Sequence, residues 1–229
     1  MSDLAGRIDA VNERIARAIA VAGRAPASVR LIAVSKRHPA SAVREAHALG
    51  LRTFGENYAQ ELVAKAGEVG PLEGIEWHMI GHLQTNKARH IAPIAAMVHT
   101  IDAPHVASEL DKRAAKVGRR IGVLIEVNVA SDPAKTGCTA DSLGAIIDAV
   151  RSSNALELRG LMTMPPYDDD PEKSRPLFAR LRELQERHGG ARALPDLSMG
   201  MSHDLEAAIA EGATMVRVGT AIFGDRQAG

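Results

Sequence analysis

Short apolar runs alternate along the chain with longer segments in which apolar residues recur every three or four positions. Runs of four to eight residues rich in β-branched and aliphatic side chains are typical of buried strands, and the longer periodic segments are typical of amphipathic helices. The pattern predicts eight strands, at residues 31–36, 52–56, 76–81, 97–102, 122–129, 158–164, 196–200 and 215–219.

A helical pattern precedes the first strand and others follow the strands along the chain. The expected helices cover residues 1–23, 40–50, 58–69, 84–92, 105–118, 142–153, 171–189 and 204–212, and a short tail begins at residues 221–224. Sustained alternation of this kind predicts a parallel sheet. Eight units in about 200 residues fit a closed (β/α)₈ TIM barrel. We expect a single domain over residues 1–229 with an extra N-terminal helix.

A doubly wound open sheet is the alternative to the barrel. Such a sheet usually has fewer strands, and no G-x-G-x-x-G motif follows the first predicted strand.

Composition and charge narrow the classes of function. The chain has 28 Lys and Arg residues and 28 Asp and Glu residues, so its formal net charge is zero, which argues against a broad nucleic-acid surface. Aromatic residues make up 3%, too few for base-stacking platforms, and we expect a monomer with no large specialised interface. The only cysteine, Cys138, excludes an internal disulfide framework.

The chain contains no stretch near the ~18 uninterrupted apolar residues of a membrane span. Charges interrupt the N-terminal segment every few residues, which is unlike a signal peptide. We therefore expect a cytoplasmic protein that does not associate with membranes.

Polar residues fall at the carboxyl ends of the predicted strands, where (β/α)₈ barrels carry their active groups. They are Lys36, Asn57, His82, Asn128, Ser198, Ser202, Arg217, Gly219 and Thr220.

Lys36 is the most informative of these residues, because it shares a strand face with Ile32 and Val34. A desolvated lysine near a second cation has a lowered pKa and can form a Schiff base. The alternative is a lysine that reaches past the strand end into solvent. Arg217 supports the first interpretation, since strands eight and one are neighbours in a closed barrel. Two cations there predict an anionic or electron-rich ligand, although an Arg217–Glu126 salt bridge is the alternative.

The loops after strands seven and eight predict a phosphate site. The segment LSMGMSHD places Ser198, Gly200 and Ser202 before a helix, with Ser202 as its expected N-cap. The segment RVGTAIFG places Gly219 and Thr220 at the end of the last strand. These two loops are the usual phosphate site of the fold, and hydroxyls and backbone amides would converge there.

An imine lysine, an arginine and a phosphate cradle together indicate pyridoxal 5′-phosphate (PLP) as the cofactor. The aldehyde of PLP would condense with Lys36, and Arg217 would face the pyridine nitrogen. Because an arginine stays protonated, that nitrogen would stay unprotonated, and stabilisation of a carbanion would be weak.

A metal site finds little support in the sequence. His78 and His82 are four residues apart, but that spacing suits metal ligation on a helix rather than on a strand that runs into a loop. We expect no metal, and His82 could instead form a hydrogen bond near the cofactor.

The segments LIAVSK, FGENYAQE, WHMIGHLQTNK, VNVASDPAKTGC, LRGLMTMPP, LSMGMSHD and MVRVGTAIFG occur in this order over nearly the whole chain. In this combination the chain resembles the YggS/PROSC family of PLP homeostasis proteins, a family similar to the barrel domain of alanine racemases without their second domain. Met79 and Thr85 depart from the family pattern, where Phe and Ser are expected.

The resemblance implies that Lys36 is the imine lysine and Arg217 the arginine at the pyridine nitrogen. It further implies that Asn57 lies beside the ring and that Ser198, Ser202, Gly219 and Thr220 form the phosphate region. The implied function is PLP binding and supply, with PLP-dependent enzymes as possible recipients and no established catalytic reaction.

Two other classes of function stay open. One is a PLP-dependent amino-acid racemase, which needs a second acid or base opposite the lysine. Neither of the two tyrosines, Tyr58 and Tyr167, has an evident claim to that role from the sequence. The other is an aldolase-like lysine enzyme that uses no cofactor.

Overall fold

The computed structural model describes residues 3–224, and its eight parallel strands form a closed barrel in which each strand pairs with its neighbours in chain order and β8 pairs with β1. The predicted (β/α)₈ barrel is thus confirmed. Residues 1–2 and 225–229 of the expected 1–229 domain lie outside the described residues. The strands are β1 Arg30–Val34, β2 Thr53–Glu56, β3 Glu76–Met79, β4 Met97–Ile101, β5 Ile121–Glu126, β6 Leu156–Met162, β7 Asp196–Met201 and β8 Met215–Val218.

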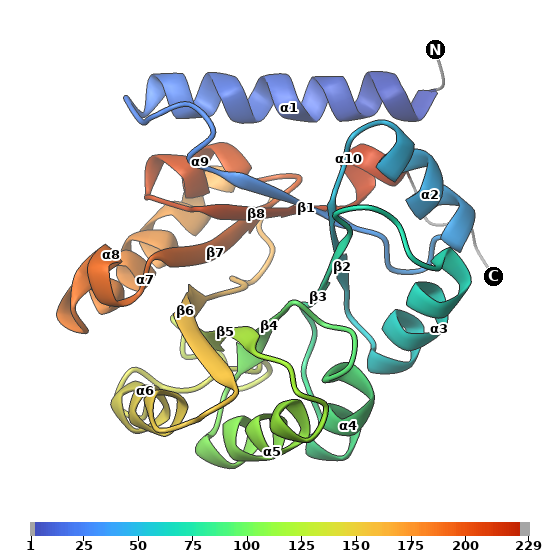
Figure 1. Ribbon diagram of the computed structural model, residues 1–229. Helices are drawn as coiled ribbons and strands as arrows, with labels where there is room; N and C mark the ends of the chain where they lie inside the picture. The colour runs from blue at the N-terminus through green and yellow to red at the C-terminus, as the bar shows by residue number, and fades with distance from the viewer. Residues whose placement is uncertain (1–2, 225–229) are drawn as a thin grey trace.

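Helices surround the strands and cover their outer faces (Figure 1). The helices are α1 Asp3–Val21, α2 Ala40–Ala48, α3 Ala59–Val69, α4 Ala88–Ile91, α5 Pro104–Lys116, α6 Leu143–Arg151, α7 Arg175–Arg187, α8 Gly190–Ala193, α9 Leu205–Ala210 and α10 Thr220–Phe223, with 3₁₀ turns η1 Thr85–Lys87 and η2 Pro171–Ser174.

The alternation of side chains along the strands separates two cores. An outer core lies between strands and helices and contains most of the buried aliphatic side chains. A small inner apolar cluster lies inside the barrel and consists of Ile32, Met97, Leu124, Met162 and Met215. The barrel is therefore a packed interior rather than a channel, and the space for a ligand lies at its mouth.

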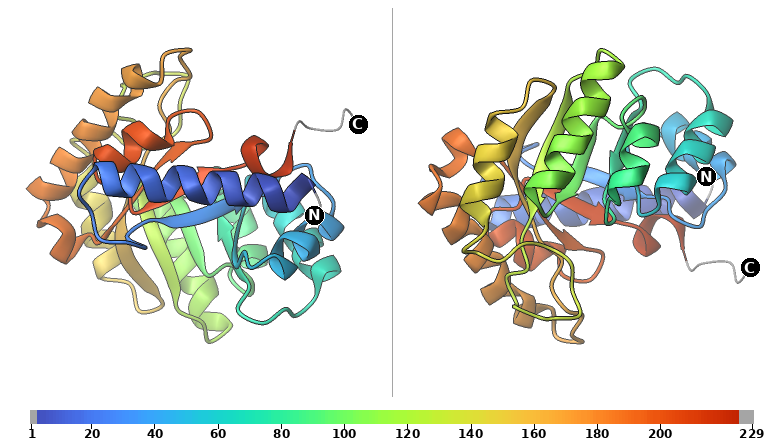
Figure 2. Two further views of the ribbon diagram at one scale, coloured as in Figure 1. Left: turned by 90° about the horizontal axis from the view of Figure 1, so that it is seen from above. Right: turned by 90° about the horizontal axis from the view of Figure 1, so that it is seen from below.

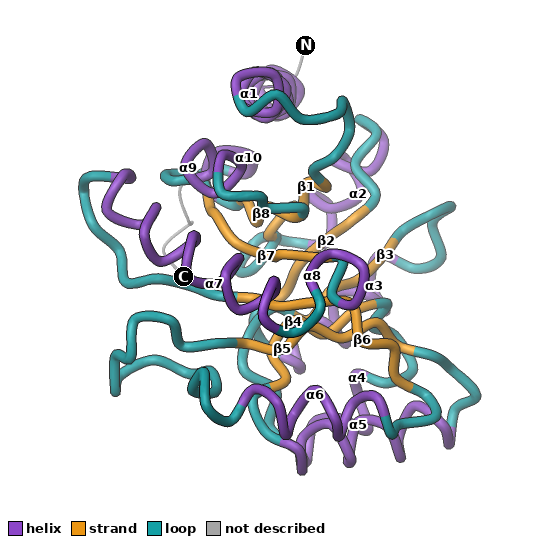
Figure 3. The backbone as a smooth tube through the Cα atoms, turned by 90° about the vertical axis from the view of Figure 1, so that its left-hand side faces the viewer, coloured by secondary structure: helices purple, strands orange, loops and turns teal. Residues whose placement is uncertain are grey.

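The N-terminal helix α1 occupies the outer surface beside β8 and β1, where the short α10 provides only one turn of cover. Its buried residues recur at helical spacing and are Leu4, Ile8, Val11, Ile15, Ala18 and Ile19. In Figures 2 and 3, α1 lies across α9 and α10 on the outside of the barrel. Arg7 Nε donates to Ile222 O at 2.6 Å, and Arg14 forms a two-point ion pair with Glu206 at 2.8 and 2.9 Å.

Several element boundaries differ from the prediction. Strand β1 ends at Val34 instead of Lys36, and β5 ends at Glu126, after which Val127 forms only an isolated bridge with Cys138. The sequence did not predict α8, and residues 171–189 are divided between η2 and α7. Within residues 3–224, no helix combines the length and apolar character that crossing a membrane requires.

Candidate functional site

A pocket of about 330 Å³ opens at the carboxyl ends of the strands, on the side of the barrel formed by β7, β8, β1 and β2. Its walls combine two cations, hydroxyl groups and apolar side chains, and no carboxylate is among the lining residues of the described chain. They are Val34, Lys36, His38, Asn57, Ile80, Met164, Tyr167, Met201, Ser202, His203, Arg217, Gly219 and Thr220. A cavity of this size with a few convergent polar groups has the character of a small-molecule site.

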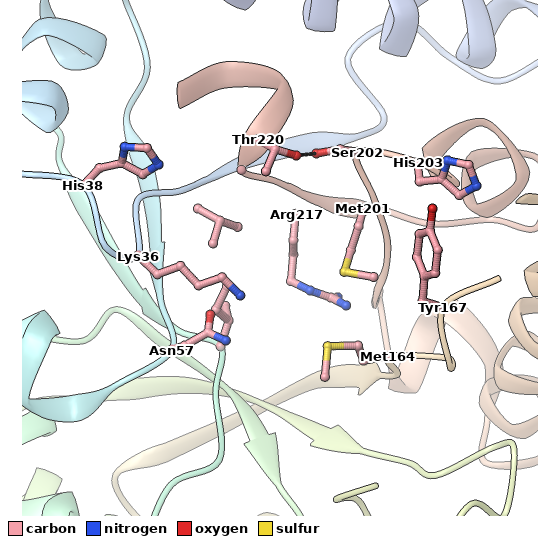
Figure 4. A pocket seen from close by; sticks show the side chains of 13 residues that line it. Lys36, His38, Asn57, Met164, Tyr167, Met201, Ser202, His203, Arg217 and Thr220 are labelled. Atoms are coloured by element: carbon pink, nitrogen blue, oxygen red, sulfur yellow. Dashed lines mark hydrogen bonds between the residues drawn. The ribbon is translucent and has the colours of Figure 1, made fainter. Parts of the chain in front are cut away.

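Lys36 lies two residues after the end of β1, and its side chain extends into the pocket beside Asn57 (Figure 4). The next residue, Arg37, has a φ of +63°, a conformation that side-chain-bearing residues seldom adopt. Contacts to α3 hold this turn on both sides of Lys36. Lys65 Nζ donates to Ser35 O at 2.6 Å, and Arg37 N donates to Glu61 Oε1 at 2.5 Å.

The anchor of this turn is a buried ion cluster around Lys65. Lys65 Nζ lies 2.6 Å from Glu56 Oε1 and 2.9 Å from Glu61 Oε1, and Ser35 Oγ donates to Glu56 Oε1 at 2.6 Å. Burial raises the pKa of the Glu56 carboxyl, and the hydrogen bond from Lys65 partly offsets that shift. Because Ser35 and Glu56 precede Lys36 and Asn57 in the chain, the cluster fixes the ends of two strands that carry pocket residues. Nothing in the local sequence indicated this structural role for Lys65.

Arg217 projects from β8 into the floor of the pocket, opposite Lys36 in Figure 4. Its NH1 donates to Ser198 Oγ at 2.7 Å and its NH2 donates to Thr163 O at 3.0 Å. Burial lowers the pKa of Arg217 to about 10, so the guanidinium stays charged at neutral pH. The alternative Arg217–Glu126 salt bridge is absent from the ion pairs of residues 3–224, and Glu126 Oε1 instead accepts from Thr136 Oγ1 at 2.7 Å.

The loops after β7 and β8 meet at the upper wall of the pocket, where Thr220 Oγ1 lies 3.4 Å from Ser202 Oγ (Figure 4). Gly200 has a φ of +88°, and a Cβ there would come within 2.5 Å of Ala208 Cβ, so the loop requires glycine. At Gly219, a Cβ would lie 3.3 Å from Val34 O. Two hydroxyl groups and closely approaching backbone thus line one side of the pocket.

The expected N-cap role of Ser202 is wrong. Helix α9 begins at Leu205 with Asp204 as its N-cap, and Asp204 Oδ1 accepts from Met201 N at 2.7 Å. This hydrogen bond of the Asp204 carboxylate closes the turn before α9. Ser202 is not used as the cap and lines the pocket.

The structure brings six of the seven predicted binding residues to one pocket, and these are Lys36, Asn57, Ser202, Arg217, Gly219 and Thr220. The seventh, Ser198, is fully buried below them and contacts Arg217 and His99. His78 and His82, which the sequence placed four apart, have different surroundings. His78 Nδ1 lies 2.9 Å from His99 Nε2 inside the barrel, while His82 Nδ1 lies 3.3 Å from Asp102 Oδ2.

Tyr167 lines the pocket, although no role for it was evident from the sequence, because the long loop after β6 gave no sign of where it would fold. Its ring lies 5.4 Å from the His203 ring, centroid to centroid, and His203 Nε2 donates to Asp169 O at 3.0 Å. These contacts join the loop after β6 to the loop after β7 beside the pocket (Figure 4).

The buried imidazoles predict a pH dependence of stability. Burial lowers the pKa of both His78 and His99, with Glu76, Arg30, Asp196 and Arg217 as the charged groups that act on them. Below about pH 6.5 these imidazoles bind protons in the unfolded chain but stay neutral in the folded protein. The free energy of unfolding therefore falls as the pH falls. We expect a loss of about 1.4 kcal/mol per pH unit for each imidazole that stays neutral.

Urea unfolding at pH 7 and pH 5.5 measures this loss. The buried carboxyls Glu56 and Glu126 have raised pKa values, which act in the opposite direction at acid pH. Both glutamates are present in the His99→Phe variant, so their contribution cancels when the variant is compared with the unchanged protein. On unfolding, the variant should take up about one proton fewer than the unchanged protein. Equal proton uptake by the two proteins would contradict the neutral state of His99.

Comparison with known proteins shows which family the chain is similar to. The family "Alanine racemase, N-terminal domain" matches residues 7–227. Proteins named pyridoxal phosphate homeostasis protein are similar over nearly their whole length. The one from Pseudomonas aeruginosa is 47% identical, over 100% of this chain and 98% of that protein, and the one from Aquifex aeolicus is 42% identical, over 96% and 97%. The solved structure of PipY from Synechococcus elongatus with PLP bound has a TM-score of 0.78 and 40% identity, and covers 92% of this chain and 100% of that one.

Proposed function

Because the chain belongs to the family of pyridoxal phosphate homeostasis proteins, built on the alanine racemase N-terminal domain, we propose that it binds PLP and serves the homeostasis and supply of this cofactor. The observation that carries the proposal is a pocket that combines Lys36 and Arg217 with two hydroxyl groups and without a carboxylate among its described lining residues. PLP presents the complementary groups, which are an aldehyde, a pyridine nitrogen and a phosphate. The residues present therefore fit PLP.

We assign the covalent attachment to Lys36. In its uncharged form the Lys36 amine attacks the aldehyde carbon, a carbon–nitrogen double bond forms, and one water molecule leaves. Addition of that water reverses the step and needs no other reactant. The turn held by Lys65 and Glu61 fixes the backbone on either side of Lys36. A reversible bond on a fixed lysine suits a protein that stores and releases its ligand.

Arg217 takes the pyridine nitrogen in this arrangement. A guanidinium with a pKa of about 10 donates a hydrogen bond and does not give up its proton to the ring at neutral pH. Bound PLP supplies an electron sink, but an unprotonated ring nitrogen makes it a weak one. This property supports a binding and supply function more than a catalytic one.

In the proposed arrangement the phosphate group would bind at the pocket wall formed by Ser202, Gly219 and Thr220, and Asn57 would lie beside the ring. Thr220 and the residue after it begin α10, so their backbone N–H groups have no acceptor within that helix. Ser198 contributes through Arg217, since its hydroxyl is buried against that guanidinium.

The proposal is tested by titration of the purified protein with PLP. We expect the absorbance band of an imine, and reduction with borohydride followed by peptide mass spectrometry should place the label on Lys36. A label spread over surface lysines, with no saturable band, would contradict the assignment.

Removal of the two hydroxyls tests the phosphate wall. Ser202→Ala combined with Thr220→Val should weaken PLP binding about tenfold, because hydrogen bonds to a charged group are lost. Binding of pyridoxal, which lacks the phosphate, should be unchanged. Equal weakening for both ligands, measured by absorbance titration, would show that these hydroxyls do not face the phosphate.

Racemisation of amino acids is the second candidate, and the position of Tyr167 favours it. A racemase needs a second acid or base besides the lysine, and the Tyr167 ring lies at the pocket that Lys36 also lines. Exchange of the α-proton of amino acids in heavy water, abolished by both Lys36→Ala and Tyr167→Phe, would establish this activity. Absence of exchange over a broad panel of amino acids would leave the supply function alone.

Our proposal further includes a cytoplasmic monomer that passes PLP to PLP-dependent enzymes. The balanced charge and low aromatic content of the chain support a protein without a large permanent interface. Light scattering should then give one chain of 24.3 kDa per particle. Reactivation of a PLP-free enzyme by the loaded protein, faster than by PLP that leaks from it, would demonstrate transfer.

A further inference from the structure

A line of hydrogen-bonded side chains crosses the interior of the barrel below the pocket. His78 Nδ1 lies 2.9 Å from His99 Nε2, His99 Nδ1 lies 2.9 Å from Ser198 Oγ, and Arg217 NH1 lies 2.7 Å from the same Ser198 oxygen. The four residues belong to β3, β4, β7 and β8, and all of them are buried. The line therefore connects one side of the barrel to the other and ends at Arg217.

The guanidinium of Arg217 donates and never accepts, which fixes the direction of the first hydrogen bond in this line. Ser198 Oγ accepts from Arg217, and among the described residues its other hydrogen-bond partner is His99 Nδ1, so donation to that nitrogen is the arrangement that gives the hydroxyl proton an acceptor. His99 then carries its own proton on Nε2 and donates to His78 Nδ1. His78 in turn carries its proton on Nε2, which lies 3.7 Å from Glu76 Oε2 at the opposite end of the barrel.

This order places the acceptor end of each group toward the cation. The Ser198 oxygen faces Arg217, and the acceptor nitrogens of His99 and His78 face the same way, so the dipoles add at the guanidinium. The other direct partner of Arg217 is the carbonyl oxygen of Thr163 at 3.0 Å. Within residues 3–224, no carboxylate forms an ion pair with Arg217. The carboxylates of Asp204 and Glu126 act on Arg217 from a distance, whereas the groups in direct contact with the guanidinium are neutral.

We propose that His99, with His78 behind it, is a positioning residue that holds Arg217 in place and stabilises its charge without neutralising it. A carboxylate in the same position would cancel the field that the pocket presents to an anionic ligand. The line cannot pass protons toward the pocket, because Arg217 has no acceptor to receive one. The effect on PLP rests on the proposed function, whereas the order of the hydrogen bonds does not.

The order is tested on the protein without PLP by nitrogen-15 NMR of labelled histidines, with His99→Phe and His78→Phe to assign the signals. We expect both imidazoles to be neutral at pH 7 and to carry their proton on Nε2. A proton on Nδ1, or a charged ring at either position at pH 7, would overturn the proposal.

The effect on the pocket is tested by PLP titration of His99→Phe, which removes both hydrogen bonds of the ring. We expect affinity to fall about tenfold. His99→Asn keeps an acceptor near the position of Nδ1 and should restore most of it. Gln185→Met is the matched control, since it removes one buried hydrogen bond, to Leu194 O at 2.6 Å on the outside of the barrel. The control should lose stability without losing affinity.

The outcomes separate the two proposals. Unchanged affinity in folded His99→Phe overturns the role of His99 in the pocket. A native protein that fails to bind PLP contradicts the proposed function, and the NMR result then decides the hydrogen-bond order by itself.

Discussion

Lys36→Ala is expected to abolish the imine absorbance and to weaken PLP binding by at least about a hundredfold. The substitution removes the only proposed covalent bond and one of the two cations that line the pocket. Because Lys36 follows β1 in a turn and contributes to no strand, the barrel should fold as before. Absorbance spectra and equilibrium dialysis with PLP measure the two losses, and circular dichroism verifies the fold.

Lys87→Ala is the matched control for this experiment. Lys87 is also a lysine near the carboxyl ends of the strands, but it belongs to η1 and does not line the pocket. The control should keep the full spectrum and the native affinity. If Lys36→Ala instead retained the same band, the lysine that carries PLP would have to be sought elsewhere.

Lys65→Met should cost about 3 kcal/mol or more of stability, the second large effect we expect. Glu56 is completely buried, and the variant leaves its carboxylate without the cation 2.6 Å away. Since burial already raises the pKa of Glu56, the carboxyl should take up a proton in the variant as the pH falls. The loss should therefore be larger at pH 8 than at pH 5, as measured by urea unfolding.

The exposed Lys112 on α5 provides the control, and Lys112→Met should change stability by less than about 0.5 kcal/mol. Adding Glu56→Gln to Lys65→Met should recover part of the loss, since the buried charge is then gone. PLP affinity should fall in Lys65→Met, because Ser35 loses its anchor next to Lys36. Similar losses in Lys65→Met and Lys112→Met would show that the buried pair contributes nothing.

The fold could be predicted from the sequence because most strand residues are buried and strands such as β1 and β5 carry nearly continuous aliphatic runs. Strand ends were less certain, since hydrophobicity does not reveal where pairing stops. Lys36 continues the alternation of β1, yet the chain turns after Val34 and the ladder ends there. Likewise, the short α8 contains only four residues, too few for a helical period to be recognised.

The sequence predicted those pocket residues that lie at or just after the ends of strands. The residues buried beneath the pocket could not be predicted, because His78, His99 and Lys65 come close to the site only when distant strands and helices pack together. Nothing in local sequence indicates that the Ser198 hydroxyl faces inward to Arg217 instead of toward a ligand. The predicted N-cap of α9 was wrong for a related reason. Both Ser202 and Asp204 are good capping residues, and the backbone geometry selects Asp204.

The position of α1 has a consequence for biosynthesis. This helix leaves the ribosome before every other described element, but its apolar stripe packs on α9 and α10, which follow seven and all eight of the strands in the chain, respectively. Arg7 and Ile222, joined by a hydrogen bond, are 215 residues apart in the chain. A nascent chain must therefore carry an uncovered amphipathic helix until α9 and α10 have been synthesised, and this exposed stripe is a natural target for chaperones.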